Sequence, residues 1–120
     1  MKKLLYTLFI LFIQFSFSQL NLDLEKSKIK WTGKKITNAS HWGSLYFTEA
    51  SLVFDGEDLI KGKFIVDMNS MTVDDIQGRG KERLENHLRD DDFFGVSTHK
   101  EATLEFNSKS ELKDGQYLVS

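Results

Sequence analysis

From residue 28 onward, apolar side chains recur at every second position, in runs separated by short turns. In the first run Ile29 and Trp31 alternate with lysine and threonine, and a later run carries Ala102, Leu104 and Phe106 between charged or polar residues. A period of two places the apolar side chains of a strand on one face, so the pattern predicts half-buried antiparallel strands. The chain has no cysteine, so packing alone must stabilise the sheet that these strands form.

Short strands and two hairpin turns follow from this alternation. Asp-Gly pairs at residues 55–56 and 114–115 have the composition of tight hairpin turns. The expected strands cover residues 28–32, 44–47, 51–54, 59–68, 101–106 and 117–120. The last of them would leave a sheet edge unpaired, which native proteins usually avoid. We therefore expect the chain to be the N-terminal piece of a longer protein.

One stretch departs from the period of two. Leu84 and Leu88 lie four positions apart, on one face of a helix, and charged residues fill most of the positions around them. This spacing predicts a short helix over residues 80–88, inserted into an otherwise antiparallel β protein. The helix would end before an acidic run at residues 90–92.

The N-terminus has the composition of an export signal. Two lysines precede an apolar segment that extends to Phe17, and serines occupy positions 16 and 18. This arrangement is typical of a secretory signal peptide over residues 1–18, cleaved after Ser18. The apolar segment of 14 positions is shorter than the roughly 20 residues that span a bilayer. We therefore expect one domain over residues 19–120, periplasmic or secreted, without a stable membrane span.

Overall charge does not indicate a charged partner. Lys and Arg number 16 against 18 Asp and Glu, a formal net charge of −2, which gives no overall reason to expect nucleic acid or an anionic membrane. Five lysines between residues 26 and 35 alternate in part with apolar positions. We interpret them as the solvent face of the first strand.

No arrangement of side chains predicts catalysis or metal binding. His41, His87 and His99 are 46 and 12 positions apart, which matches no compact zinc motif. The acidic run at 90–92 lacks the alternating ligands and central glycine of a calcium loop. The chain has no Gly-x-Ser-x-Gly nucleophile elbow. We expect no cofactor, no metal and no enzymatic activity.

Several short motifs occur in a fixed order. They are Trp-Thr-Gly at 31–33, His-Trp-Gly at 41–43, Val-Asp-Met-Asn-Ser at 66–70, His-Leu at 87–88 and Asp-Phe-Phe-Gly-Val at 92–96. Together with the strand at 102–106, they resemble the YceI-like family of exported proteins that bind lipids and polyisoprenoids. Two positions depart from the family pattern: Lys100 replaces a proline and Gly95 replaces an aspartate. Both departures affect a local turn.

The resemblance implies an all-β fold, an antiparallel lipocalin-like β-barrel of eight strands with a short helical insertion, of which this chain would cover roughly the first two thirds. It also implies that the barrel holds a polyisoprenoid-type lipid, such as a quinone or a prenyl phosphate. The candidate lining residues are the apolar ones along the strands: Trp31, Trp42, Leu45, Phe47, Phe54, Phe64, Val66, Leu104 and Phe106. His41 would lie near the mouth, where a polar head group needs hydrogen-bond donors.

Two other functions remain open at this point. A barrel of about eight strands can be filled by its own side chains and act as a structural or stress-response protein without a ligand. An enzyme acting on a lipid would need one of the three histidines beside a second polar group in a cleft. The sequence also leaves open a homodimer.

Overall fold

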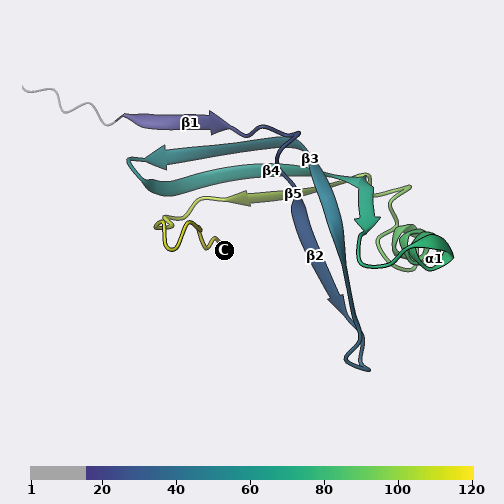
Figure 1. Ribbon diagram of the computed structural model, residues 1–120. Helices are drawn as coiled ribbons and strands as arrows, with labels where there is room; N and C mark the ends of the chain where they lie inside the picture. The colour runs from purple at the N-terminus through teal and green to yellow at the C-terminus, as the bar shows by residue number, and fades with distance from the viewer. Residues whose placement is uncertain (1–15) are drawn as a thin grey trace, which may run out of the picture.

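The computed structural model describes residues 16–120, so most of the signal peptide expected over residues 1–18 lies outside the described residues. The described chain is mostly β, with five antiparallel strands in one sheet and one helix (Figure 1). In chain order the elements are β1 (Phe17–Asn21), β2 (Ile29–Lys34), β3 (Ser40–Asp55), β4 (Asp58–Val73), α1 (Gly78–Arg89) and β5 (Glu101–Phe106). Within the described residues, no helix has the length and apolar composition needed to cross a membrane.

A long hairpin of β3 and β4 forms the centre of the sheet. Its strands have 16 residues each, and Asp55 pairs with Asp58 across the tight turn that joins them. β2 pairs with the first part of β3 and β1 with its last part, while β5 pairs with the middle of β4. β1 and β5 do not pair with each other, so the described strands form an open sheet. In Figure 1, β2 and the adjoining part of β3 bend away from the hairpin as an arm.

Most apolar side chains of the hairpin share one face because an irregularity in the strand pairing shifts their alternation by one position. In β3 the pairing shifts between Phe47 and Glu49. Before the shift, odd-numbered positions share a face with Val66 of β4, and after it even-numbered positions such as Leu52 do. A bulge moves the alternation by one position. The two short strands that we expected within residues 44–54 are therefore one continuous strand.

A second irregularity, in β4, is built by polar side chains. After Asp67, β4 has more residues than the segment of β3 that faces it. The Ser70 hydroxyl donates to the Asp67 carbonyl oxygen over 2.6 Å and accepts from the Tyr46 N–H over 2.8 Å. Met68 and Met71, three positions apart, are both buried. The bulge thus lets apolar side chains on either side of it face the same core.

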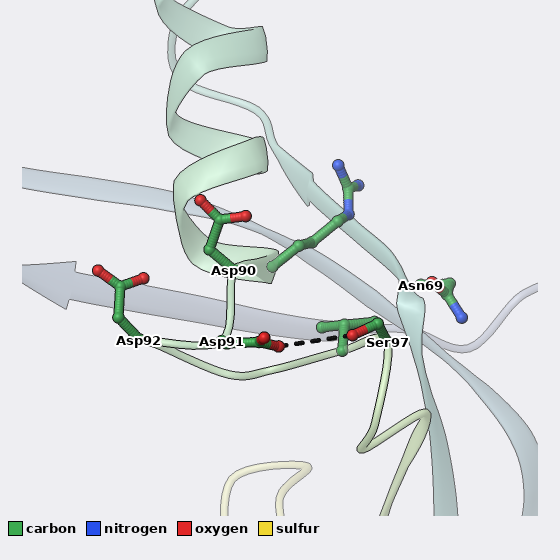
Figure 2. A pocket seen from close by; sticks show the side chains of 7 residues that line it. Asn69, Asp90, Asp91, Asp92 and Ser97 are labelled. Atoms are coloured by element: carbon green, nitrogen blue, oxygen red, sulfur yellow. Dashed lines mark hydrogen bonds between the residues drawn. The ribbon is translucent and has the colours of Figure 1, made fainter.

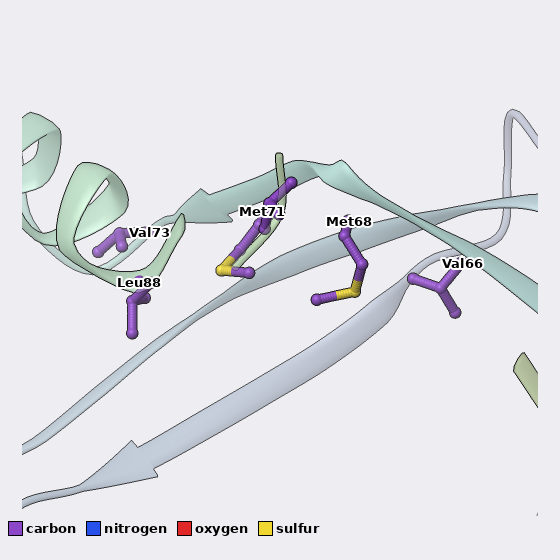
Figure 3. Close-up of a cluster of buried hydrophobic side chains, with 6 residues drawn as sticks. Val66, Met68, Met71, Val73 and Leu88 are labelled. Atoms are coloured by element: carbon purple, nitrogen blue, oxygen red, sulfur yellow. The ribbon is translucent and has the colours of Figure 1, made fainter. Parts of the chain in front are cut away.

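The main core lies where α1 packs beside the C-terminal end of β4 (Figure 3). Leu88 is the buried residue of the helix. The other members of the buried cluster are Val66, Met68, Met71, Val73 and Val96. The expected helix over 80–88 is confirmed, and it extends from Gly78 to Arg89.

The two ends of the sheet differ from the sequence prediction. The strand expected over residues 117–120 is not formed. Ser110 forms an isolated bridge with Leu59. The Ser110 hydroxyl also donates to the Leu118 carbonyl oxygen over 2.7 Å, which holds the last residues beside this bridge. The strands expected from the sequence do not include β1, whose first two residues fall within the expected signal peptide. β1 nevertheless pairs with five residues of β3, from Asp55 back to Ser51.

Candidate functional site

A row of aromatic rings crosses one face of the sheet, which we call the apolar face. Phe47 of β3, Phe64 of β4 and Phe106 of β5 follow one another, with ring centroids 5.4 Å and 6.3 Å apart. Cross-strand partners project to the same side of a sheet. Val66 therefore lies on this face opposite Phe47, and Leu104 lies on it opposite Phe64. The aromatic row thus spans three neighbouring strands, β3, β4 and β5.

Gly62 makes room for the last ring of the row. It pairs with Phe106, and a Cβ atom at Gly62 would lie 2.3 Å from a carbon of the Phe106 ring. No side chain at position 62 can coexist with the ring in this place. The ring of Phe106 thereby covers bare backbone and is itself buried.

Toward the sheet edges the apolar face is open. Leu104 of β5 is 52% exposed, and Leu20 of β1, which pairs with Leu52, is 51% exposed. Half-exposed leucines beside a row of aromatic rings form a contiguous apolar surface, and such surfaces mark sites of ligand or protein binding. At the other end of the sheet, α1 and the core cover the face.

Eight of the nine candidate lining residues lie on the apolar face. Four of them belong to the core beside α1 or pack against it: Trp31, Leu45, Phe47 and Val66. Four lie on the rest of the face: Phe54, Phe64, Leu104 and Phe106.

Trp42 lies on the opposite face. It pairs with Thr32, the neighbour of Trp31, and successive residues of a strand project to opposite sides. Its ring is 39% exposed, with the Lys30 ammonium 4.5 Å from the ring centroid. The structure does not bring Trp42 together with the other eight residues.

His41 lies on the same side of the arm as Trp31 and is held by a carboxylate. Its Nδ1 is 2.9 Å from Oδ2 of Asp75. Burial raises the pKa of Asp75, but hydrogen bonds from His41 and the backbone lower it by more, and the pKa is below its ordinary value. Asp75 therefore stays ionised and orients the ring. Its other oxygen, Oδ1, is buried without a hydrogen-bond partner among the described residues.

Gly43 lies where the backbones of β3 and β4 meet the Trp31 ring. The Trp31 Nε1–H donates to the Thr72 carbonyl oxygen over 3.1 Å. A Cβ atom at Gly43 would lie 1.7 Å from that oxygen and 2.8 Å from a carbon of the indole ring. The His-Trp-Gly and Trp-Thr-Gly motifs therefore meet in space, and glycine is required for the contact.

Asp74 binds two hydroxyl groups. Ser44 donates to its Oδ2 over 2.6 Å and Thr72 to its Oδ1 over 2.8 Å. The Ser44 hydrogen bond lowers the pKa of Asp74 most; burial opposes it, and Thr72 and Lys81 lower the pKa further. The Ser44 hydroxyl is thus bonded to Asp74 rather than to His41, and no serine of the described chain is hydrogen-bonded to the pair of His41 and Asp75.

Helix α1 completes the hydrogen bonding at the end of β4. Glu85 accepts the Val73 N–H over 2.9 Å and forms an ion pair with Lys81 over 2.7 Å. Lys81 in turn donates to the Val73 carbonyl oxygen. Burial raises the pKa of Glu85, but the Lys81 and Val73 hydrogen bonds lower it by more, to below its ordinary value. Two charged side chains thus satisfy both backbone groups of a fully buried residue.

The acidic run lines a shallow pocket at the C-terminal end of α1, together with Asn69 and Ser97 (Figure 2). Ser97 contacts Asp91 at 3.5 Å, and the side chains of Asp90 and Asp92 do not converge on the same point. Within the described residues, no group of three or more His, Asp or Glu side chains has an arrangement that could hold a metal ion. The other two histidines lie elsewhere: His87 packs against Phe93, and His99 lies beside Gly95.

Leu20 is the member of the apolar face that sequence reasoning missed. Leu20, Leu22 and Leu24 alternate with polar residues directly after the expected cleavage site. This alternation was the available signal for β1. It is short, and it adjoins an apolar segment assigned to export.

A family model described as a YceI-like domain matches residues 20–120 of the chain. It covers the described sheet, except the first residues of β1, and the helix. No curated protein and no solved structure matches the chain significantly.

Proposed function

Because the chain belongs to the YceI-like domain family, we propose that it is a non-catalytic protein that binds a long polyisoprenoid-type lipid, such as a quinone or a prenyl phosphate. The family comprises small β-barrel proteins that bind lipids or isoprenoids. In this proposal the apolar face holds the lipid chain. The protein acts after export, in the periplasm or outside the cell.

The continuous apolar face is the observation that carries the proposal. An isoprenoid chain is slender and has no hydrogen-bonding groups along its length, so it requires a long surface of the same kind. The half-buried rings of Phe47 and Phe64 supply part of such a surface, and the buried ring of Phe106 extends the apolar face to β5. Leu20 and Leu104, each about half exposed, supply apolar area that a ligand would remove from water.

Burial of a long isoprenoid chain releases enough free energy to exceed the cost of association. Each CH₂ group removed from water contributes about 0.8 kcal/mol, so twenty carbons give about 16 kcal/mol. Association and ordering cost several to more than ten kcal/mol. The remainder corresponds to an affinity in the micromolar to nanomolar range.

His41 is the proposed contact for a polar head group. Asp75 holds one nitrogen of its ring, which leaves the second ring nitrogen for a hydroxyl, carbonyl or phosphate oxygen. His41 and Trp31 are on the same side of the arm by the β2–β3 register. A head group bound by His41 would therefore lie on the side of the sheet that carries the apolar face.

Mass spectrometry of lipids extracted from the purified full chain tests the proposal. We expect an isoprenoid lipid with the wild-type protein. Leu104→Glu should lower the amount of bound lipid more than tenfold, because a carboxylate against an apolar chain costs several kcal/mol. Leu104 is half exposed without ligand, so the variant should keep its fold.

The matched control is Thr103→Glu. Thr103 is the preceding residue of β5, exposed and on the opposite face. This variant introduces the same charge and should retain lipid like the wild type. Absence of lipid from the wild-type protein would contradict the proposal and favour a structural protein without a ligand. Recovery of a chemically altered lipid would favour an enzyme.

A further inference from the structure

The arm formed by residues 28–44 concentrates positive charge in an acidic chain; we call it the basic arm. It contains Lys28, Lys30, Lys34 and Lys35 and no acidic residue. The rest of the chain has 12 basic and 18 acidic side chains. The near-neutral total therefore conceals a strongly basic segment, which Figure 1 shows projecting away from the β3–β4 hairpin.

An apolar side chain occupies the tip of the basic arm. The turn between β2 and β3 is fixed by two backbone hydrogen bonds, from Lys35 N–H to the Ala39 carbonyl over 2.8 Å and from Asn38 N–H to the Lys35 carbonyl over 3.1 Å. Within this turn Ile36 has a relative exposure of 104%, so it contacts none of the protein core. A defined turn thus holds a β-branched apolar side chain in water beside two lysines.

Aromatic and cationic side chains share one face of the basic arm. Lys30 and Lys34 alternate with Trp31 and Gly33, which places them on the face that carries Trp42. Trp42 is partly exposed and lies beside the Lys30 ammonium. Tryptophan and lysine together are typical of proteins at the membrane–water interface, where the ring enters the headgroup layer and the ammonium contacts phosphate.

The acidic side chains that contact the basic arm do not neutralise its tip. Among the hydrogen bonds and ion pairs of the described residues, these contacts come from Asp74, bonded to Ser44, and Asp75, bonded to His41. Neither Lys34 nor Lys35 forms an ion pair with another described residue.

We propose that the basic arm docks the protein on an anionic phospholipid bilayer, with Ile36 inserted among the headgroups and the lysines on lipid phosphates. Charge complementarity and the exposed apolar tip favour a bilayer over a soluble polyanion, which has no place to bury an isoleucine. Docking would bring the apolar face to the source of its lipid if the function proposed above holds. It does not depend on that function.

Vesicle binding of the full chain tests the proposal. The vesicles contain phosphatidylcholine alone or with about one third phosphatidylglycerol, and no isoprenoid, so failure here is distinct from failure of isoprenoid binding. We expect binding to the anionic vesicles that weakens as salt is raised. The double variant Lys34→Gln/Lys35→Gln should bind them about 25-fold more weakly. The control Lys61→Gln/Lys113→Gln, which changes two exposed lysines outside the arm, should bind like the wild type.

Insertion of the tip is measured separately. The chain has no cysteine, so one introduced cysteine can be labelled with an environment-sensitive fluorophore. The two labelled variants are Ile36→Cys and, as a control at an exposed position, Ser108→Cys. Fluorescence should rise on anionic vesicles at position 36 and not at position 108. No binding to anionic vesicles, or equal binding by the Lys34/Lys35 variant, would overturn the proposal. Binding without a response at position 36, matched by binding to heparin, would show a soluble polyanion site instead.

Discussion

A glycine in the His-Trp-Gly motif has a steric role that can be measured. Gly43 lies against the Thr72 carbonyl oxygen and the Trp31 ring, with no space for a Cβ atom. Gly43→Ala must therefore separate β3 from β4 or displace the indole ring and its hydrogen bond to Thr72. We expect the free energy of unfolding to fall by about 2–4 kcal/mol in urea denaturation.

The second motif glycine is the control for this prediction. A Cβ atom at Gly33 would meet the Trp31 ring at 3.6 Å, an ordinary contact. Gly33→Ala should change the free energy of unfolding by less than about 0.5 kcal/mol. Equal losses in the two variants would show that glycine matters at these positions for backbone freedom rather than for the close approach.

Ionised Glu85 stabilises the fold, and acid removes this contribution. The pKa of Glu85 is lowered in the folded state, so folding favours its ionised form. This contribution is fully present above the unfolded-state pKa of about 4.3 and is lost as the pH falls through the lower, folded-state value. Glu85→Gln keeps an acceptor for the Val73 N–H but removes the ion pair with Lys81, and should cost about 1 kcal/mol at pH 7.

The pH profile separates this role from a general loss of packing. Glutamine does not titrate, so the stabilities of wild type and Glu85→Gln should converge as the pH falls below about 4. A difference that stays constant from pH 7 to pH 3 would contradict the prediction. Melting temperatures across this range provide the measurement.

Among the elements, the bulge in β4 shows how a short motif fixes the pairing of β4 with β3, and this role can be tested by substitution. In the Val-Asp-Met-Asn-Ser motif, the Ser70 hydroxyl bonds both the Asp67 carbonyl and the Tyr46 N–H. Ser70→Ala removes both bonds and should lower the free energy of unfolding by about 1 kcal/mol. It should also accelerate hydrogen exchange at the Tyr46 amide. Ser108→Ala, at an exposed position, should have neither effect.

The period of two and the helical spacing predicted the central elements but not the irregularities that connect them. Strand 59–68 and the helix at 80–88 depend on side chains close in sequence, and both are found within β4 and α1. The bulges depend on which residues of β3 face β4, and that pairing is not encoded in either strand alone. The four residues at 117–120 alternate correctly but have no partner strand within residues 16–120, so alternation by itself does not make a strand.

The same reason limits how far the site could be predicted. Alternation placed eight lining candidates on the apolar face, because each strand keeps its own two sides. Trp42 departs because it lies between His41 and Gly43 in β3 and so projects to the other side of the strand. The Asp75 partner of His41 lies 34 positions away, beyond the reach of any local pattern.

At the scale of the whole molecule, the apolar face has a filled end and an open end. Val66 is 7% exposed and faces Phe47 across the hairpin, so Val66→Phe should overpack the core beside α1. We expect a loss of about 1–3 kcal/mol in the ligand-free protein. Leu104→Phe, at the open end, should change stability by less than about 0.5 kcal/mol.

Melting curves with and without lipid extend this comparison. If the open end is the lipid site, added lipid should raise the melting temperature of the wild type and of Val66→Phe, because both keep that end unchanged. Equal destabilisation by the two phenylalanine substitutions would contradict a division into filled and open ends.

The short turn between β3 and β4 determines which strands of the sheet can pair first. Pairing Asp55 with Asp58 closes a loop of only two residues. The outer strands are much farther apart in sequence: about 40 positions separate Phe17 from Asp55 and Phe106 from Gly62. Closing a longer loop costs more entropy. β3 and β4 can therefore pair with each other, starting at their turn, before the outer strands pair with either of them. During synthesis, this makes β3 and β4 the segments most in need of protection from pairing with another chain.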